Sequence, residues 1–346
     1  MLPYFIVISF ILIWMALEKY SIHRKSFWVP LLTLSLFSGL RSHRVGTDSW
    51  SYTRDFRNNL NIYNFNFNPN VELGYQVFEY ILLRFTHNYF WLFFLTSLFI
   101  VWCHLKVARD YSRNYILSIL FYFTLSSYTF FFNGLRQGIA MAFIALSTPY
   151  IIRKDTFKFF LLILIASLFH KSALFIIPFY ILLHLRIQLK YKLLITFLSS
   201  FILSRLVIKI LASENQRYEI YTKESENAGG FLILSFYILI GLSLYMLNHL
   251  YKVKDEIYHK LLTFYLLGMA FMIPIAMLKT NPSGPQRLIY YFTWALMLLI
   301  PTILQKINSR LVYTMSIALA LIYFYMTTSR FGSLAPYTLN PIFKVL

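Results

Sequence analysis

Several charged side chains of this sequence lie between long apolar runs. In the stretch "FFNGLRQGIAMAFIALS", residues 131 to 147, Asn133, Arg136 and Gln137 stand between two such runs. An arginine within an apolar bilayer costs about 2.5 to 3.5 kcal/mol on insertion scales, so it usually faces a bundle interior, a cavity or a partner. Its guanidinium is permanently charged and has a forked set of donors that suits phosphate and carboxylate groups. The simpler alternative is a side chain that snorkels to the lipid headgroups.

Other polar residues are expected at the same membrane level as Arg136, and they come from separate apolar segments. These residues are Arg41, Arg287, and the neighbouring His170 and Lys171. Their convergence predicts one cationic cavity that opens to one side of the membrane. For His170 and Lys171, the alternative is a polar turn at the end of a helix.

The segment from 41 to 88 adds acidic and aromatic residues. Asp48, Tyr52 and Asp55 follow one another at roughly helical spacing, and nearby aromatic residues supply an apolar side. This pattern predicts a short helix that lies at the membrane interface. The alternative role of Asp48 and Glu72 is to cap or begin a helix, because acidic residues are favoured there.

The composition defines the class of protein. Apolar residues make up 58% of the 346 residues, charged residues only 13%, and the mean hydropathy is +0.60. Soluble domains are roughly half apolar and one quarter charged, so we expect an integral membrane protein with a single domain over residues 1 to 346. The net charge of +19 comes without a basic block and does not indicate nucleic-acid binding. Because Cys103 is the only cysteine and no histidine has convincing ligand spacing, we expect no disulfide and no metal site.

Apolar segments of helix length predict an all-α polytopic membrane bundle. Counting segments of about 17 to 25 residues, we expect about twelve transmembrane helices, with roughly ten to twelve compatible with the pattern. Several segments are short, notably 27–40 and the pair around His170, and the alternatives for these are broken or tilted helices or one re-entrant pair. The first segment lacks the basic start and the cleavage site of a signal peptide, so we expect it to be retained. Two long connections, 41 to 88 and 205 to 229, are expected to be loops. The predicted spans lie near residues 2–18, 27–40, 89–105, 116–132, 135–151, 157–169, 173–185, 193–211, 230–250, 261–278, 288–305 and 311–328.

Basic residues in the short connections predict the orientation, because lysine and arginine collect on the cytoplasmic side. One alternate set of connections has two or three basic residues in each member, and this set is therefore expected in the cytoplasm. Both termini, both long loops and the level of Arg136 are then predicted to lie outside. The basic connections are "EKYSIHRK", "KVARDYSR", "RKDTFK", "RIQLKYK", "YKVKDEIYHK" and "QKINSR".

Five motifs follow one another along the chain: "GLRSHRVGTDSWSY", "VELGYQVF", "FNGLRQGIAMAF", "LFHKSALFIIP" and "PQRLIYYF". Their order and spacing resemble those of the EpsG family, which belongs with the Wzy-type polysaccharide polymerases. The resemblance covers residues 35 to 180 well and 280 to 305 loosely. Its most specific parts are the asparagine-arginine-glutamine and phenylalanine-histidine-lysine-serine signatures. The residues that carry over are Arg41, Gly46, Asp48, Tyr52, Glu72, Asn133, Arg136, Gln137, His170, Ser172 and Arg287.

The resemblance implies a glycosyltransferase of O-antigen, capsule or exopolysaccharide synthesis. Such an enzyme joins oligosaccharide repeat units carried on undecaprenyl pyrophosphate at the outer face of the bacterial cytoplasmic (inner) membrane. It needs no metal and no other cofactor, and a bundle similar to the GT-C glycosyltransferases is one arrangement that would suit it. The implied partners are the lipid-linked donor and acceptor, membrane lipid, a chain-length regulator and a flippase, with no nucleic acid.

This chemistry assigns expected roles to the candidate residues. Cations stabilise the departing pyrophosphate, and the candidates are Arg41, Arg136 and Arg287. The acceptor hydroxyl needs a general base. Asp48 is the first candidate for the base, followed by His170 and Glu72. Further substrate contacts are expected from Asn133, Gln137, Tyr52, Lys171 and Ser172.

Two other functions are compatible with parts of the pattern. A flippase or other transporter of lipid-linked oligosaccharides would also need a cationic cavity. Transporters usually have internal repeats, and none is visible in this sequence. An acyltransferase that modifies surface glycans would use a histidine on the cytoplasmic side, whereas His170 is predicted to lie outside.

Overall fold

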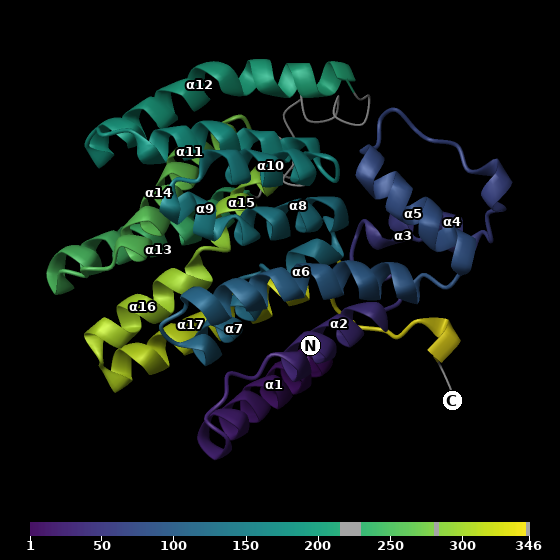
Figure 1. The fold of residues 1–346 in the computed structure, drawn as a ribbon, viewed down its shortest axis with the longest axis horizontal. Coiled ribbons are helices and arrows are strands. Elements are labelled where there is room, and N and C mark those ends of the chain that lie inside the picture. Colours follow the sequence, from purple (N-terminus) through teal and green to yellow (C-terminus); the bar gives the residue numbers. More distant parts are fainter. Residues whose placement is uncertain (215–229, 280–283, 344–346) are drawn as a thin grey trace. The chain divides into compact units, whose positions relative to one another are not determined.

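The computed structural model describes residues 1–214, 230–279 and 284–343, and the regular elements of these residues are all helices (Figure 1). The all-α prediction is therefore confirmed. The α-helices are α1 (Leu2–Ser21), α2 (Trp28–Gly39), α3 (Ser49–Tyr52), α4 (Arg54–Arg57), α5 (Leu73–Phe85), α6 (Phe90–Tyr111), α7 (Tyr115–Thr124), α8 (Leu135–Leu146), α9 (Thr148–Arg153), α10 (Thr156–Ser167), α11 (Ile176–His184), α12 (Leu189–Glu214), α13 (Gly230–Tyr251), α14 (Glu256–Met277), α15 (Tyr290–Thr293), α16 (Leu296–Ile307) and α17 (Arg310–Arg330). The 3-10 helices are η1 (Ile62–Asn64), η2 (Thr129–Phe132), η3 (Lys171–Phe175), η5 (Pro285–Ile289) and η6 (Pro341–Phe343).

The chain forms two compact units. Unit 1 contains Met1–Thr148, Leu161–Ala173 and Leu296–Leu346, and unit 2 contains Pro149–Phe160 and Leu174–Ala295. All but one of the predicted site residues belong to unit 1, and Arg287 belongs to unit 2. The expectation of a single domain over residues 1 to 346 stays a prediction.

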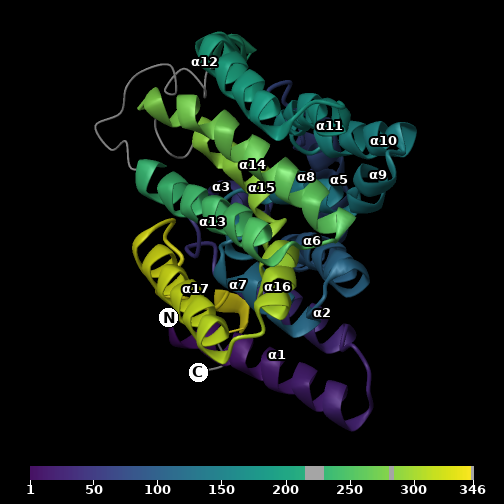
Figure 2. The ribbon, with the colours of Figure 1, turned by 90° about the vertical axis from the view of Figure 1, so that its left-hand side faces the viewer.

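Unit 2 is built around α14, which packs against α11, α12 and α13 (Figure 2). Asp255 caps α14 by accepting hydrogen bonds from the next turn of backbone N–H groups. Within the unit, the Tyr265 hydroxyl donates to the Tyr237 carbonyl at 2.6 Å. Aromatic packing of Phe292 against Phe179, with ring centroids 4.8 Å apart, adds to this core. Unit 2 is thus held by apolar contacts along one central helix.

In unit 1, α6 is the central helix and packs against α2 and α8, while α7 packs against α16. The core is strongly aromatic. The rings of Phe123 and Tyr128 stack with centroids 5.1 Å apart, and the Tyr128 hydroxyl donates to the Leu34 carbonyl at 2.7 Å. Such aromatic contacts contribute about 0.5 to 1.5 kcal/mol each beyond their buried area. This core fixes the helix ends that present the candidate site.

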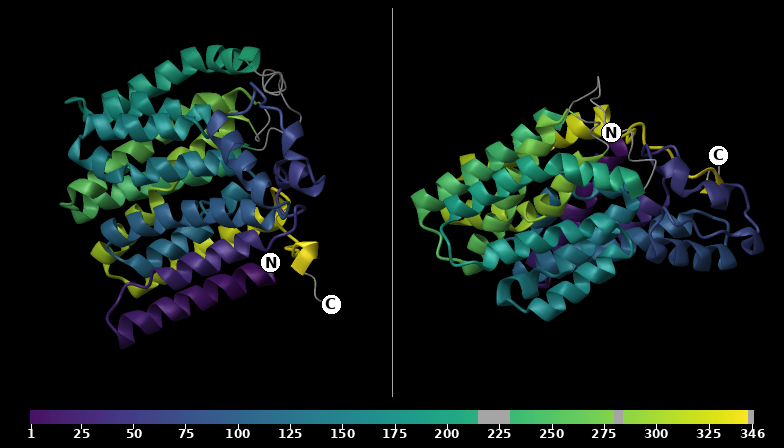
Figure 3. Two further views of the ribbon diagram at one scale, coloured as in Figure 1. Left: turned by 45° about the vertical axis from the view of Figure 1, so that its right-hand side comes forward. Right: turned by 90° about the horizontal axis from the view of Figure 1, so that it is seen from above.

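The C-terminal segment lies along the loop that follows α2 (Figure 3). The Ser42 N–H donates to the Thr338 carbonyl at 2.7 Å, and the Asn340 N–H donates to the Leu40 carbonyl at 2.8 Å. Near the start of α1, the Tyr4 hydroxyl donates to the Leu334 carbonyl at 2.8 Å. The beginning of α1, the C-terminal segment and the start of the 41–88 loop therefore share one end of unit 1, which is called the loop end below.

Two of the basic connections meet elsewhere in unit 1, beyond the other end of α1. There the Lys25 ammonium donates to the Arg109 carbonyl at 2.6 Å, and Arg24 pairs with Glu18 at 3.0 Å. This grouping is compatible with the predicted cytoplasmic set of connections. The orientation of the chain in a membrane stays a prediction.

The expected count of about twelve spans is wrong for the described residues. Six helices are long and apolar enough to cross a membrane, or up to seven if the bent pair of Pro285–Thr293 and Leu296–Ile307 forms one span. The chain is thus polytopic, but a GT-C-like bundle is not borne out. Four of the predicted spans are instead shorter apolar helices, namely Trp28–Gly39, Leu135–Leu146, Thr156–Ser167 and Lys171–His184.

The length of these helices explains the miscount. A helix rises about 1.5 Å per residue, so a helix of 12 residues is about 18 Å long and falls short of the bilayer core of about 30 Å. The predicted segment 27–40 agrees with Trp28–Gly39 in position, so the error was to count so short a segment as a full span. The expected loop 41–88 contains the short helices α3, α4, η1 and α5. The expected loop 205–229 begins inside α12, and residues 215–229 lie outside the described residues.

Candidate active site

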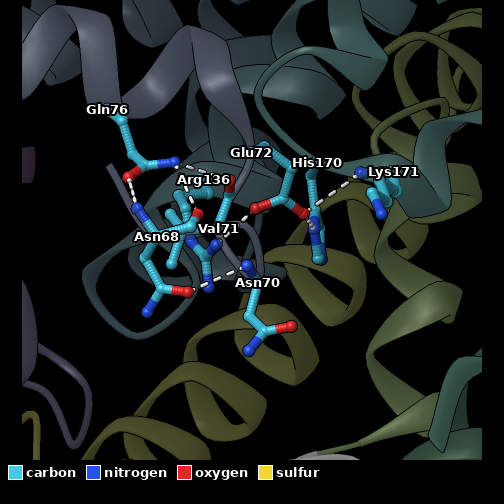
Figure 4. Close-up of polar contacts among 8 residues, drawn as sticks. All are labelled: Asn68, Asn70, Val71, Glu72, Gln76, Arg136, His170 and Lys171. Carbon is cyan, nitrogen blue, oxygen red and sulfur yellow. Dashed lines mark hydrogen bonds and ion pairs between the residues drawn. The ribbon is translucent and has the colours of Figure 1, made fainter. Parts of the chain in front are cut away.

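Glu72 is the centre of a largely buried ionic cluster at the loop end of unit 1 (Figure 4). Its carboxylate forms an ion pair with Arg136 through one oxygen. The other oxygen lies 2.8 Å from Nδ1 of His170 and accepts a hydrogen bond of 3.2 Å from the Lys171 N–H. The Glu72 side chain is only 8% exposed, and those of Arg136 and His170 are 17% exposed. We call Glu72, Arg136 and His170 the ionic cluster.

A folded turn before α5 presents Glu72 to its partners. The Gln76 amide donates to the Asn68 carbonyl at 2.9 Å and to the Val71 carbonyl at 2.7 Å, and its oxygen accepts from the Asn68 N–H at 2.6 Å. One side chain of α5 therefore closes the turn that leads into the helix (Figure 4). Glu72 is the N-cap residue of α5, but its carboxylate makes no capping hydrogen bond and is directed to the ionic cluster instead.

Close packing of α5 against the end of α10 brings Glu72 to His170. The Gly74 N–H donates to the Leu168 carbonyl at 2.8 Å, and a Cβ atom at Gly74 would lie only 2.7 Å from that carbonyl oxygen. Only glycine allows this approach. The chain then turns beyond α10, so that His170 and the Lys171 N–H face the Glu72 carboxylate.

Arg136 lies in the first turn of α8 and is enclosed by aromatic residues as well as by Glu72. Its guanidinium carbon is 5.9 Å from the centroid of the Tyr75 ring, and its charge interacts with the Tyr52 hydroxyl. The rings of Tyr52 and Tyr75 meet edge to face, with centroids 5.8 Å apart. Within the described residues, the Tyr75 hydroxyl is buried without a hydrogen-bond partner. The guanidinium thus lies between a carboxylate and two tyrosines.

The ionic cluster keeps Glu72 in its charged form. Burial alone would raise the pKa of this carboxyl, but the hydrogen bond from His170 and the charge of Arg136 outweigh burial and lower the pKa to about 2. An ionised carboxylate with three donors around it is a poor acceptor for a further proton at neutral pH. The geometry therefore favours a positioning role for Glu72, which orients Arg136 and His170.

Asp48 and Asn133 belong to a neighbouring turn at the loop end. The Asn133 side-chain oxygen accepts a hydrogen bond of 2.6 Å from the Thr47 N–H and so ties the 46–49 turn to the segment before α8. Asp48 is the N-cap residue of α3, but its side chain makes no capping hydrogen bond and accepts from the Thr47 hydroxyl at 3.3 Å. Asp48 therefore begins α3, as the alternative interpretation expected, but without a side-chain capping hydrogen bond. The residue is half-buried.

Gly46 is required by the backbone of this turn. Its φ is +101°, a conformation that L side chains rarely adopt, and an added Cβ would lie 2.6 Å from the Phe132 carbonyl oxygen. We expect Gly46→Ala to lower the free energy of unfolding by about 1 to 3 kcal/mol, because both strain and overlap arise. The measurement is the thermal midpoint in detergent. A midpoint equal to that of the native protein would show that the turn tolerates a Cβ atom.

Arg41 is fully buried, and its contacts are with residues outside the ionic cluster. Its guanidinium carbon is 3.5 Å from the centroid of the Phe93 ring and 4.2 Å from that of Phe132, and the group donates to the Ser38 carbonyl at 2.8 Å. Within the described residues, Nε and one terminal nitrogen have no hydrogen-bond partner. In this conformation Arg41 contacts protein groups on all sides, and its predicted contact with pyrophosphate stays untested.

The remaining predicted residues are placed as follows. Gln137 is buried in α8 directly after Arg136. Lys171 and Ser172 begin η3, next to the cluster. Arg287 is part of η5 in unit 2, where its N–H donates to the Gly284 carbonyl at 3.0 Å. Among the residues that the structure describes, no three histidine, cysteine or acidic side chains are grouped closely enough to hold a metal ion.

Three residues at this end of unit 1 were not identified from the sequence. Gln76 and Tyr75 are part of the quoted motif "VELGYQVF", but their contacts with the 68–71 turn and with Arg136 depend on the fold. Glu79 follows Tyr75 by four residues and so lies on the same face of α5. That helical spacing was the signal that could have pointed to Glu79.

The fold and the cluster define a class: a polytopic helical membrane protein in which a few charged groups converge at one end of a bundle. The sequence model of the EpsG family matches residues 24–339, so the chain belongs to the EpsG family. This family is associated with polysaccharide polymerisation. Searches of curated proteins and of solved structures found no match.

Proposed function

We propose that this protein is a polysaccharide polymerase of the bacterial cytoplasmic membrane. It joins oligosaccharide repeat units that are carried on undecaprenyl pyrophosphate, and it does so at the outer face. The observation that carries the proposal is the ionic cluster, in which Glu72 holds Arg136 and His170 together at the loop end of unit 1. Membership of the EpsG family supports the same reaction class.

The cluster has the charge needed for transfer from a lipid pyrophosphate. In this reaction an acceptor hydroxyl oxygen bonds to the anomeric carbon of the donor, and the bond from that carbon to the pyrophosphate breaks. The electron pair stays on the pyrophosphate, and the hydroxyl proton goes to a base. Arg136 pairs with the single negative charge of Glu72, and Lys171, whose backbone N–H donates to the same carboxylate, adds a second positive charge to this segment of the chain. Preorganised cations of this kind stabilise a developing negative charge.

The roles of the other predicted residues follow from this arrangement. Tyr52 and Tyr75 offer ring faces and edges beside Arg136, which suits contacts with a sugar ring. His170 and Asp48 are proposed to contact the acceptor, and Arg287 to contact the pyrophosphate. Asn133 is proposed to position the turn that presents Asp48. A chain-length regulator and a flippase are the proposed partners.

Reconstitution tests the function directly. Purified protein in liposomes is given lipid-linked repeat units, and the products are separated by size. We expect new oligomers on one lipid carrier, with release of the carrier pyrophosphate from the donor. A transporter of the same substrate would move the units across the bilayer and leave them as single units, so transport without oligomers would replace our proposal by that alternative.

A further inference from the structure

Two carboxylates of the α5 segment lie near Arg136, and their surroundings differ. Glu72 is bound by an ion pair and two further contacts, as described above. Glu79 lies two helical turns further along α5 and forms no hydrogen bond and no ion pair with any described residue. Glu79 is half-buried, so it is partly shielded from water and still accessible to solvent. A carboxylate without a partner beside a cationic site is free to accept a proton from a ligand.

The groups that face Glu79 come from three other helices as well as from its own. Asp55 and Arg54 of α4 and Arg136 of α8 are close enough for their charges to act on the Glu79 carboxyl. Tyr75 lies one turn before it on the same face of α5, and the ring of Tyr52 of α3 meets the Tyr75 ring edge to face. Arg54 pairs with Asp55 at 3.0 Å and is 70% exposed, so its attraction for the Glu79 carboxylate is weakened by Asp55 and by water. The negative charge of Asp55 opposes ionisation of Glu79.

The two carboxyl groups consequently have very different proton affinities. Burial raises the pKa of Glu79 to about 8, the charge of Asp55 adds to this rise, and Arg54 and Arg136 only partly oppose it. The pKa of Glu72 is lowered to about 2. Paired titratable groups whose environments separate their pKa values in this way are typical of acid and base roles. Glu72 remains charged and orients Arg136, whereas Glu79 can exchange a proton near neutral pH.

We propose that Glu79 is the general base that accepts the proton of the acceptor sugar hydroxyl. This inference rests on the proposed function. The hydroxyl proton moves to a carboxylate oxygen of Glu79 as the hydroxyl oxygen bonds to the anomeric carbon of the donor. The pyrophosphate leaves with the electron pair of the broken bond, beside Arg136. Protonated Glu79 then releases its proton to water, and the site is ready for the next acceptor.

The test compares the turnover of purified variants with lipid-linked repeat units. We expect Glu79→Gln to lower turnover by about 100-fold to 10,000-fold, which is the range of a general base. The thermal midpoint should not fall, because a neutral amide replaces a carboxyl that is already neutral in much of the protein at pH 7. Glu256→Gln, which changes a 75% exposed side chain of α14, is the matched control and should leave turnover unchanged.

The pH profile separates a base from a structural residue. A base must be deprotonated, so turnover of the native protein should rise as pH increases through about 8. Asp55→Asn removes a negative charge that opposes ionisation of Glu79, and we expect it to shift this rise to lower pH. A merely structural Glu79 would give no such shift. Glu79→Asp should retain part of the turnover.

Two results would overturn the inference. If Glu79→Gln retains near-native turnover while Asp48→Asn or His170→Ala loses it, the base is Asp48 or His170. If the native protein forms no oligomers at all, the proposed function fails, and the assignment of a base fails with it. The first result leaves the polymerase proposal intact, so the two failures are distinguishable.

Discussion

Arg136→Lys is expected to lower polymer formation by about 100-fold to 1,000-fold, the range seen when one preorganised donor to a developing charge is removed. The guanidinium pairs with Glu72 and still has other N–H groups for a second anion. A lysine ammonium is a point charge and lacks this forked geometry. The measurement is initial turnover in liposomes at matched amounts of folded protein.

The control for this variant is Arg44→Lys, which changes an exposed arginine of the 41–88 loop at the same end of unit 1. Because both variants keep their positive charge, a general effect of charge on substrate attraction would be equal in the two. We expect Arg44→Lys to retain turnover. Full turnover in Arg136→Lys would show that Arg136 only reaches toward lipid headgroups, which is the simpler interpretation of its place in the sequence.

Glu72→Gln is expected to destabilise the protein by about 3 to 5 kcal/mol, the usual cost of removing one partner from a buried ion pair. The variant leaves the 17% exposed Arg136 side chain without a counter-ion and weakens the contact with His170. It should also lose polymer formation, because Arg136 is no longer held in place. Stability is measured as the thermal midpoint or the denaturant midpoint in detergent.

A double-mutant cycle separates these two effects. Glu72→Gln with Arg136→Gln removes both charges, so the double variant should lose less stability than the sum of the two single variants. Its polymer formation should remain absent. Purely additive losses in stability would contradict the buried pair. Glu256→Gln provides the reference for an exposed pair, and we expect it to leave the midpoint nearly unchanged.

The sequence predicted the residues of the cluster better than it predicted their contacts. Arg136 and His170 were candidates as polar residues beside apolar runs, and Glu72 was a candidate as an acid of the 41–88 segment and of a family motif. Glu72 is separated from Arg136 by 64 residues and from His170 by 98, so no local pattern reveals that it binds both. The Gly74 and Leu168 contact that brings these segments together also depends on the tertiary fold.

Other differences have equally specific causes. Hydropathy identified most of the apolar segments but did not show which of them cross a membrane, because a short helix such as Trp28–Gly39 is as apolar as a full span. Arg41 shares its residue type with Arg136, yet its side chain packs between Phe93 and Phe132. Glu79 resembles an ordinary solvent-facing glutamate in the middle of a helix. Only its burial near Asp55 distinguishes it.

The central claim is that the lipid-linked repeat unit binds at the ionic cluster. The most direct measurement replaces Tyr52, which interacts with Arg136, by a photoreactive phenylalanine and adds labelled lipid-linked repeat units. The same replacement at Tyr20, which is 73% exposed near the end of α1, serves as the control. We predict that illumination cross-links the labelled repeat unit to the protein at position 52 and that an excess of unlabelled repeat units reduces this cross-linking. The residue at position 20 should cross-link little of the labelled repeat unit. Equal labelling at both positions, or no labelling at position 52 in a variant that still polymerises, would contradict the account.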